Sequence, residues 1–334
     1  MADAQAQAEN GPRPGGLARG TAILALWGAV VGVLVVVTAI AVAVVDDLSA
    51  APPWHDPGGD ASSLEALAGL EELTEDGADR ALRIAGSGSN IPLTRELAEA
   101  FMRRRPGERV IVFESVGSTG GVRAASDDVV DLGMISRPLR PAEESLGLVV
   151  LPYAHVAVAA VANLDVGDDA LTSDELIAIY AGERRQWSDG AAIVVLQRER
   201  GDSSHAAVDA VLPAFAEVNE RAYREERWRV LYNDRAMHEA LVSTPGAIGL
   251  LDVGVTKVRA LALKVLTLDG VRPTEADVRS GRYPFTKELA FVSGDQPTGL
   301  ARDFLDFVRS SDGQALIRQQ GYIPEVPPGR GGGR

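Results

Sequence analysis

Three short segments of the sequence combine glycine with small polar side chains, at residues 86–90 (GSGSN), 117–121 (GSTGG) and 198–205 (RERGDSSH). Glycine lets a backbone approach a ligand closely, and hydroxyl groups can donate hydrogen bonds to that ligand. Arg198 adds a guanidinium, which can hold two oxygens of an oxyanion at once. These residue types predict the binding of a small anion, although each segment alone is also typical of an ordinary helix cap.

The three segments follow predicted strands and lead into predicted helices. Strands are expected at 81–86, 109–115, 129–136 and 191–198, and helices at 93–107 and 203–219. The apolar run at 147–163 predicts a pair of strands that crosses into a second lobe. This alternation predicts an α/β fold with largely parallel sheets. In such sheets ligands gather at the carboxyl ends of strands, where helix N-termini present unpaired N–H groups.

Motifs for catalysis are missing from the sequence. It contains neither a G-x-x-x-x-G-K-[ST] phosphate loop nor a G-x-S-x-G nucleophile elbow, and Ile91 stands where a dinucleotide fingerprint needs its third glycine. None of the four histidines lies in an H-E-x-x-H motif. We therefore expect a binding protein rather than an enzyme, with no catalytic residues, no cofactor and no metal site.

The composition excludes some partners, cross-links and anchors of the chain. The 334 residues include 47 acidic and 33 basic side chains, for a net charge of −14, which argues against a nucleic-acid partner. The chain has no cysteine, which excludes disulfides and a lipidated cysteine anchor. The negative net charge does not exclude an anion ligand, because surface charge is screened beyond about 8–10 Å at physiological salt.

An uncharged apolar stretch near the N-terminus predicts a transmembrane helix at residues 22–45. At about 1.5 Å per residue its length exceeds the hydrocarbon core of a bilayer. Arginines precede the stretch and aspartates follow it, so the positive-inside rule places the N-terminus in the cytoplasm. A cleaved signal peptide ending near Ala50 is the alternative.

The stretch divides the chain into five predicted parts. They are a cytoplasmic tail at 1–21, the span at 22–45, an extracytoplasmic linker at 46–80, a substrate-binding domain at 81–326, and a disordered tail at 327–334. The expected location is therefore the cell membrane, with one span and the binding domain outside.

Several motifs occur in the order found in phosphate-binding proteins of ABC transporters, and the chain resembles that family from Ala81 to Pro324. The motifs include GSGSNIP at 86–92, VGSTGGV at 116–122, DLGMISRPL at 131–139, RERGDSS at 198–204 and FLDFVRSSDGQALIRQQGYIP at 304–324. The resemblance implies a two-lobed periplasmic-binding-protein fold of type II. It implies a first lobe at about 81–161 and 256–326, a second lobe at about 162–255, and hinges near Ala160 and Val255.

The resemblance also implies a set of ligand-binding residues. Asn90 and Ile91 would offer backbone N–H groups, and Ser118 would offer a hydroxyl and an N–H. Arg198 would be the cationic partner, with Ser203 and Ser204 at a helix N-terminus on the far side.

Two positions depart from the family's pattern. Ser136 stands where transport phosphate binders carry an aspartate that accepts a hydrogen bond from protonated phosphate. Asp202 stands where the pattern has a serine. Asp202 has two possible roles, as a substitute acceptor or as the N-cap of the following helix.

The sequence therefore predicts a membrane-anchored extracytoplasmic binding protein for phosphate or a similar tetrahedral oxyanion. It would serve uptake through an ABC permease, or sensing. The alternative is a degenerate binding-protein fold that acts as a membrane-tethered signalling or scaffold module.

Overall fold

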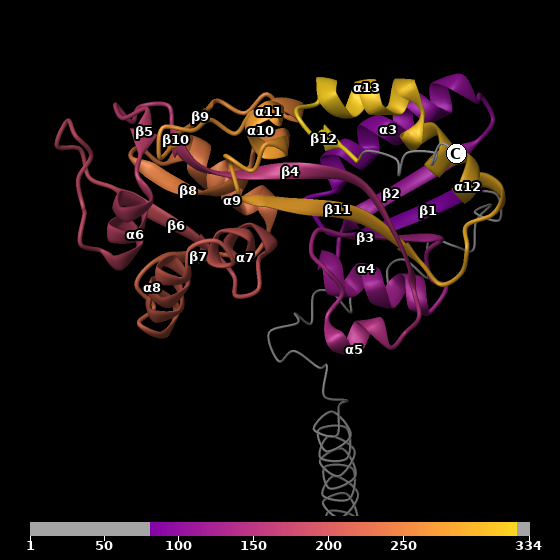
Figure 1. Cartoon of the computed structure of the whole chain (residues 1–334), viewed down its shortest axis with the longest axis horizontal. Coiled ribbons are helices and arrows are strands. Elements are labelled where there is room, and N and C mark those ends of the chain that lie inside the picture. The colour runs from indigo at the N-terminus through magenta and orange to yellow at the C-terminus, as the bar shows by residue number, and fades with distance from the viewer. Residues whose placement is uncertain (1–80, 326–334) are drawn as a thin grey trace, which may run out of the picture. The chain divides into compact units, whose positions relative to one another are not determined.

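The computed structural model describes residues 81–325, in which strands and helices alternate along the chain (Figure 1). Ten of the described strands form one sheet, whose main path runs β2-β1-β3-β11-β4-β8-β6-β7, with β9 and β12 also paired to β4. The strands of this sheet are β1 (Ala81–Gly86), β2 (Arg109–Ser115), β3 (Leu132–Ile135), β4 (Val149–Asn163), β6 (Val194–Arg198), β7 (Arg229–Leu231), β8 (Ala247–Asp252), β9 (Leu263–Val265), β11 (Thr286–Ser293) and β12 (Ile323–Pro324). The short strands β5 (Ala170–Leu171) and β10 (Thr267–Leu268) pair separately.

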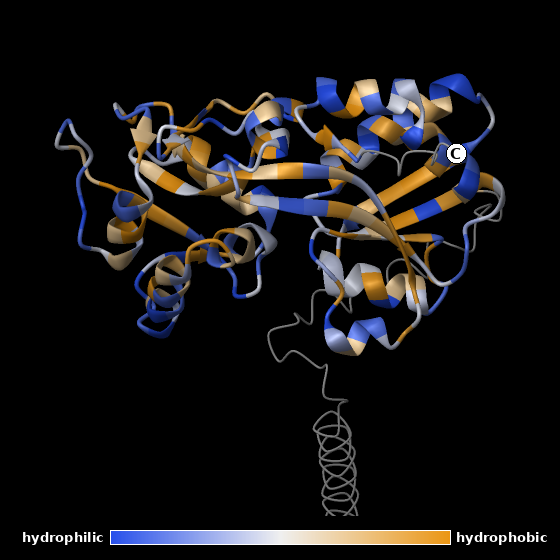
Figure 2. Ribbon diagram, in the orientation of Figure 1, coloured by the Kyte–Doolittle hydropathy of each residue, from blue (hydrophilic) through white to orange (hydrophobic). Residues whose placement is uncertain are grey.

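Helices cover both faces of the sheet. They are α3 (Ile91–Arg104), α4 (Gly117–Ser126), α5 (Pro141–Glu144), α6 (Ser173–Ala181), α7 (Ser203–Asp209), α8 (Pro213–Arg224), α9 (Asp234–Ser243), α10 (Val253–Val258), α11 (Glu275–Arg279), α12 (Gly299–Arg309) and α13 (Ser311–Gln319). Figure 2 shows the hydrophobic strands and the hydrophilic residues on the outward faces of these helices.

The first lobe is built around β1, β2, β3, β11 and the first part of β4. Successive strand residues point to opposite faces, so a strand buried on both sides feeds two cores. Ile84 and Phe291 belong to the core under α3, α12 and α13, whereas their neighbours Ala85 and Val292 belong to the core under α4. The sheet of this lobe is therefore covered on both faces.

The second lobe repeats this arrangement around the last part of β4 with β6 and β8. Val158 and Ala160 of β4 pack in a core with Trp187 and Phe215. The alternate residues of β4 pack instead with Met237 and Leu241 of α9. The expected two-lobed α/β fold is confirmed, and the two lobes share β4.

Strand direction differs from the expectation of largely parallel sheets. Within the lobes β1 pairs in parallel with β2 and β3, and β6 pairs in parallel with β7 and β8. At the centre β4 and β11 run antiparallel to each other and to their other neighbours. The predicted strand pair at 147–163 is a single strand, β4, whose ladder with β11 shifts register at Tyr153 and continues on both sides of it.

In the second lobe the structure differs from the sequence-based predictions at one helix and at one lobe boundary. The helix predicted at 203–219 is divided into α7 and α8, because Pro213 has no N–H to continue α7 and instead begins α8. Tyr283 and Phe285 pack in the second core, although the sequence assigned residues 256–326 to the first lobe. We therefore propose that the chain returns to the first lobe between Phe285 and Leu289, which packs in the first core.

Across residues 81–325 no helix combines the length and apolarity that a bilayer crossing requires. The span predicted at residues 22–45, and the linker and tails predicted around it, lie outside the described residues.

Candidate functional site

Serine hydroxyls from both lobes meet at the carboxyl ends of β1, β3 and β6. Ser87 follows β1, Ser136 follows β3, and Ser203 begins α7 after β6. The Ser87 and Ser136 hydroxyls are 2.8 Å apart, and the Ser136 hydroxyl donates to that of Ser203 over 3.0 Å. Because Ser203 belongs to the second lobe, this chain of hydroxyls joins the two lobes. We call Ser87, Ser89, Ser136, Ser203 and Ser204 the serine cluster.

Lys287 of β11 places an ammonium group inside the serine cluster. Its Nζ donates to the hydroxyls of Ser89, Ser203 and Ser204 over 2.8, 2.9 and 3.0 Å. Nζ also lies 2.8 Å from Oδ1 of Asp252, at the end of β8. The Lys287 side chain is only 3% exposed, so its charge is held by these partners rather than by water.

Asp252 completes this group of buried polar side chains. Its carboxylate also accepts a hydrogen bond from the Ser204 hydroxyl, over 3.3 Å. Burial raises the pKa of the Asp252 carboxyl, because a low-polarity environment disfavours its charged form, and Lys287 opposes that rise. The carboxylate and the ammonium are therefore each buried with the other as the main compensation.

Arg198 ends β6 and is held by carboxylates. Its Nη1 lies 2.5 Å from Asp234 and 3.4 Å from Asp202, and its Nε and Nη2 donate to Glu199 over 2.8 and 2.9 Å. Its Nε also donates to the carbonyl of Leu231. Burial alone would lower the pKa of Arg198, but the surrounding carboxylates outweigh burial and raise it. The guanidinium is charged and already paired.

Asp202 occupies the N-cap position of α7. Its Oδ1 accepts hydrogen bonds from the backbone N–H groups of Ser204 and His205 over 3.0 and 3.1 Å, and faces the Nδ1 of His205 at 3.2 Å. Burial opposes ionisation, but Arg198 and then His205 hold the pKa of Asp202 far below its usual range. Of the two roles predicted for Asp202, these contacts are those of the cap. The acceptor role stays a prediction.

The first loop holds Asn90 with its side chain turned into the first lobe. The amide Nδ2 donates to the carbonyl of Ile135 over 3.2 Å and to the Tyr153 hydroxyl over 3.1 Å. The backbone N–H of Asn90 donates to the carbonyl of Ser87, and Ile91 begins α3 with a buried side chain. The predicted ligand role of these two N–H groups is not tested by this arrangement.

Ser118 is joined to the serine cluster, whereas Arg137 is not. The Ser118 hydroxyl accepts the backbone N–H of Ser136 over 3.2 Å. Arg137 forms two hydrogen bonds of 2.7 Å with Glu143 and one of 3.0 Å with Thr119. Burial disfavours the ionised form of Glu143, but the Arg137 hydrogen bond and other contacts outweigh it and lower its pKa. Arg137 therefore has a structural ion pair.

Gly88 shows how closely the two lobes approach. A Cβ on Gly88 would lie 1.9 Å from Oδ2 of Asp234, which belongs to the second lobe. The same Asp234 carboxylate binds Arg198 through its other oxygen. Because residue 88 is a glycine, the Asp234 side chain has room to lie against the first loop while it binds Arg198, the residue predicted to pair with the anion.

The structure adds residues that the sequence did not single out, above all Lys287, Asp252 and Asp234. Lys287 precedes the apolar run Leu289–Val292 of β11, and a lysine that is almost fully buried is uncommon without a partner. A lysine shortly before an apolar run was the available signal. Its partner lies on another strand, so sequence spacing alone did not connect them.

Comparisons with known proteins agree with this architecture. A family described as the PBP superfamily domain matches residues 72–312. The phosphate-binding protein PstS of Bacillus subtilis is 30% identical over 258 residues, covering 75% of this chain and 82% of that protein. A phosphate-bound substrate-binding protein structure from Clostridium perfringens has a TM-score of 0.64 and 24% identity, covering 74% of this chain and 100% of that chain. At that identity the structural likeness supports the fold alone.

Proposed function

Because the chain belongs to the periplasmic-binding-protein superfamily, and within it to the phosphate-binding proteins of ABC transporters, we propose that it binds inorganic phosphate where its two lobes meet. This family consists of substrate-binding proteins rather than enzymes. The chain would therefore hold the anion and release it unchanged.

The observation that carries the proposal is the serine cluster around Lys287. Each hydroxyl can rotate its proton toward an oxyanion, because among residues 81–325 it bonds only to other hydroxyls, to Lys287 or to Asp252. The Lys287 ammonium supplies charge-assisted hydrogen bonds from inside the cluster. A tetrahedral anion accepts hydrogen bonds from several directions, which fits donors contributed by both lobes.

We include the residues predicted from the sequence in this site. Ser118, Ser136, Ser203 and Ser204 lie in or beside the cluster, which supports a role for their hydroxyls. Arg198 is connected to the first loop through Asp234 at Gly88. For Arg198 to bind an anion, a carboxylate must leave it. The Asp234 and Glu199 side chains are 29% and 33% exposed, so either can turn toward water.

A second candidate function is a scaffold or signalling module without a ligand. The neutralisation of the Arg198 charge by carboxylates favours this function. Asp202, Asp234 and Glu199 already neutralise the guanidinium, as they would if its role were structural. Phosphate titration separates the two functions, because a ligand that binds the native state raises its stability by mass action.

The test is isothermal titration of the full-length chain, purified in non-ionic detergent, with phosphate and with sulfate. We expect phosphate to bind one site per chain and to raise the melting temperature. Ser136→Ala removes a central hydroxyl of the cluster, and Ser145→Ala removes an exposed hydroxyl of the first lobe as the matched control. Ser136→Ala should weaken phosphate binding while Ser145→Ala leaves it unchanged. Absence of phosphate binding to the parent would support the scaffold function instead.

We also propose that residues 22–45 anchor the binding domain outside the cytoplasmic membrane, where it delivers phosphate to an ABC permease or reports its presence. The apolar length of the segment, the arginines before it and the extracytoplasmic character of the family support this topology. N-terminal sequencing of the mature protein from membranes tests it. A chain that starts just after Ala50 would mean that a signal peptide is cleaved and that the anchor does not exist.

A further inference from the structure

Two strands, and the residue that follows a third, place side chains that can bind a metal together on the first lobe, away from the serine cluster. His155 lies on β4, between β11 and β12. Glu288 of β11 is directly opposite His155 in the antiparallel ladder, so the two side chains share a face of the sheet. On the other side of β4, Ile323 is opposite His155, and Glu325 follows two residues later.

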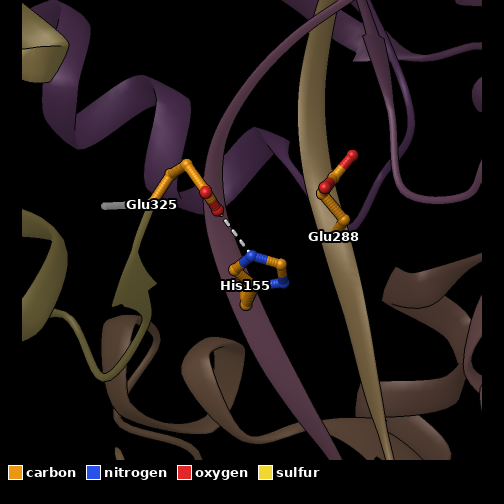
Figure 3. Close-up of side chains that lie close together, drawn as sticks. All are labelled: His155, Glu288 and Glu325. Carbon is orange, nitrogen blue, oxygen red and sulfur yellow. Dashed lines mark hydrogen bonds and ion pairs between the residues drawn. The ribbon is translucent and has the colours of Figure 1, made fainter. Parts of the chain in front are cut away.

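The donor atoms of these three residues lie close together. One ring nitrogen of His155 and one carboxylate oxygen from each of Glu288 and Glu325 all lie within 4.8 Å of one another. The His155 Nε2 is 2.6 Å from Oε2 of Glu325, and Figure 3 shows the Glu325 carboxylate turned toward the imidazole and the Glu288 side chain on the neighbouring strand β11. A tetrahedral zinc ion with bonds of about 2.0–2.1 Å separates its ligand atoms by roughly 3.4 Å. The present spread of the three atoms, from 2.6 Å to at most 4.8 Å, brackets that spacing.

The charges of the cluster are not balanced by its surroundings. Within residues 81–325 the Glu288 carboxylate makes no hydrogen bond or ion pair, and its side chain is exposed. Arg279 donates to the carbonyl of Pro324, beside Glu325, but its charge is paired with Glu275. With a neutral imidazole the three groups carry two negative charges at short range. A divalent cation would compensate both.

We propose that His155, Glu288 and Glu325 form a binding site for a divalent transition metal, for which zinc is the best match. One imidazole and two carboxylates are zinc ligands that leave a fourth position open to water, whereas calcium and magnesium prefer all-oxygen sites. No local motif predicts this site, because His155 and Glu325 are 170 positions apart and meet only through strand pairing.

The proposed metal site is separate from the proposed phosphate site. Lys287 and Glu288 are neighbours on β11, and neighbouring strand residues point to opposite faces. Lys287 contacts the serine cluster, while Glu288 faces His155. A variant at Glu288 therefore tests the metal site without removing a group that contacts the serine cluster.

The experiment titrates the full-length chain with Zn²⁺ in a phosphate-free buffer and measures heat and stoichiometry. We expect one zinc ion per chain at this site. Glu288→Gln keeps the size of the side chain and the His155–Glu325 pair, and should weaken zinc binding at least about tenfold. Glu217→Gln, at an exposed glutamate of α8, is the matched control and should bind zinc as the parent does. Phosphate binding should be the same in all three proteins.

Two outcomes would overturn the proposal. If Glu288→Gln binds zinc as tightly as the parent, any zinc binds elsewhere, and the His155–Glu325 contact serves only to hold β12 against β4. If Ca²⁺ displaces Zn²⁺ at equal concentration, the site lacks the nitrogen ligand that we assign. Co²⁺ gives an independent measurement, because its visible absorption band should appear in the parent and in Glu217→Gln but be lost or strongly weakened in Glu288→Gln.

Discussion

Replacing Lys287 by methionine should destabilise the fold at pH 7, because it leaves the buried Asp252 carboxylate without its cation. The two side chains are 3% and 6% exposed and their charged atoms are 2.8 Å apart. Breaking one half of such a buried pair costs about 3–5 kcal/mol. For a domain of this size each kcal/mol lowers the melting temperature by about 2–4 °C, so we expect a fall of roughly 6–20 °C.

The loss should depend on pH in a defined direction. Burial raises the pKa of Asp252 and Lys287 opposes that rise, so the variant should have a still higher native pKa at this position. A carboxyl with a raised native pKa binds its proton more tightly in the folded state than in the unfolded state. The folded variant therefore regains stability as the pH falls from 7 through that raised pKa toward the ordinary value of about 4. The difference between variant and parent should shrink over this window.

Chemical denaturation of the parent, Lys287→Met, and Lys287→Met with Asp252→Asn tests the reasoning at pH 7 and pH 4. The second substitution removes the unpaired charge, so the double variant should recover much of the lost stability at pH 7. Lys257→Met, at an exposed lysine of α10, is the matched control and should change the unfolding free energy by less than about 0.5 kcal/mol. An equal loss at both pH values, or no recovery in the double variant, would refute the charge argument.

Three further outcomes follow from the site. Gly86→Ala should lower the unfolding free energy by about 3 kcal/mol or more in urea denaturation, because φ is +148° and the new Cβ would lie 2.2 Å from the carbonyl oxygen of Met134. Asp234→Asn should strengthen phosphate binding roughly tenfold by titration calorimetry, since it removes a negative charge from Arg198; weaker binding would contradict this. Asp202→Ser should leave the phosphate-to-sulfate affinity ratio unchanged in competition binding, because the carboxylate serves the helix N-terminus; a lower ratio would establish the acceptor role.

The sequence predicted local features of the fold well. The strand at Ala81–Gly86 and the strand at Arg109–Ser115 match the structure, because apolar residues and glycine or proline boundaries are local signals. The direction of β4 was not predictable in this way, because an apolar run carries no information about its neighbours. The same limit applies to the lobe boundary. Tyr283 packs in the second core through contacts such as its hydroxyl bond to Val158, 125 positions away.

The residues of the candidate site also fall into two groups, those that the sequence predicted and those that it did not. Ser203 could be singled out because it lies in a glycine- and hydroxyl-rich loop after a strand, whereas Ser136 was singled out only through the resemblance to phosphate-binding proteins. The structure brings their hydroxyls together. Lys287 and Asp252 were missed because one lies near the start of β11 and the other at the end of β8, and only the folding of the sheet brings them together. The pairing of Arg198 with carboxylates could not be predicted from the sequence either. The approach of Asp234 to Arg198 spans 36 positions and depends on where α9 begins.

The position of Lys287 connects ligand binding to the arrangement of the lobes. Its ammonium bonds Ser89 of the first lobe and Ser203 of the second, so these contacts exist together only while the lobes are close. The Ser136–Ser203 hydrogen bond imposes the same condition. A ligand can shift a conformational equilibrium only through its different affinity for the two states. An anion that accepted hydrogen bonds from both sets of serines would have that difference, because an open arrangement would offer it the donors of one lobe at a time. The anion would then stabilise the closed form in proportion to the bonds gained from the second lobe, and a permease that recognises the closed form would respond to the ligand without touching it.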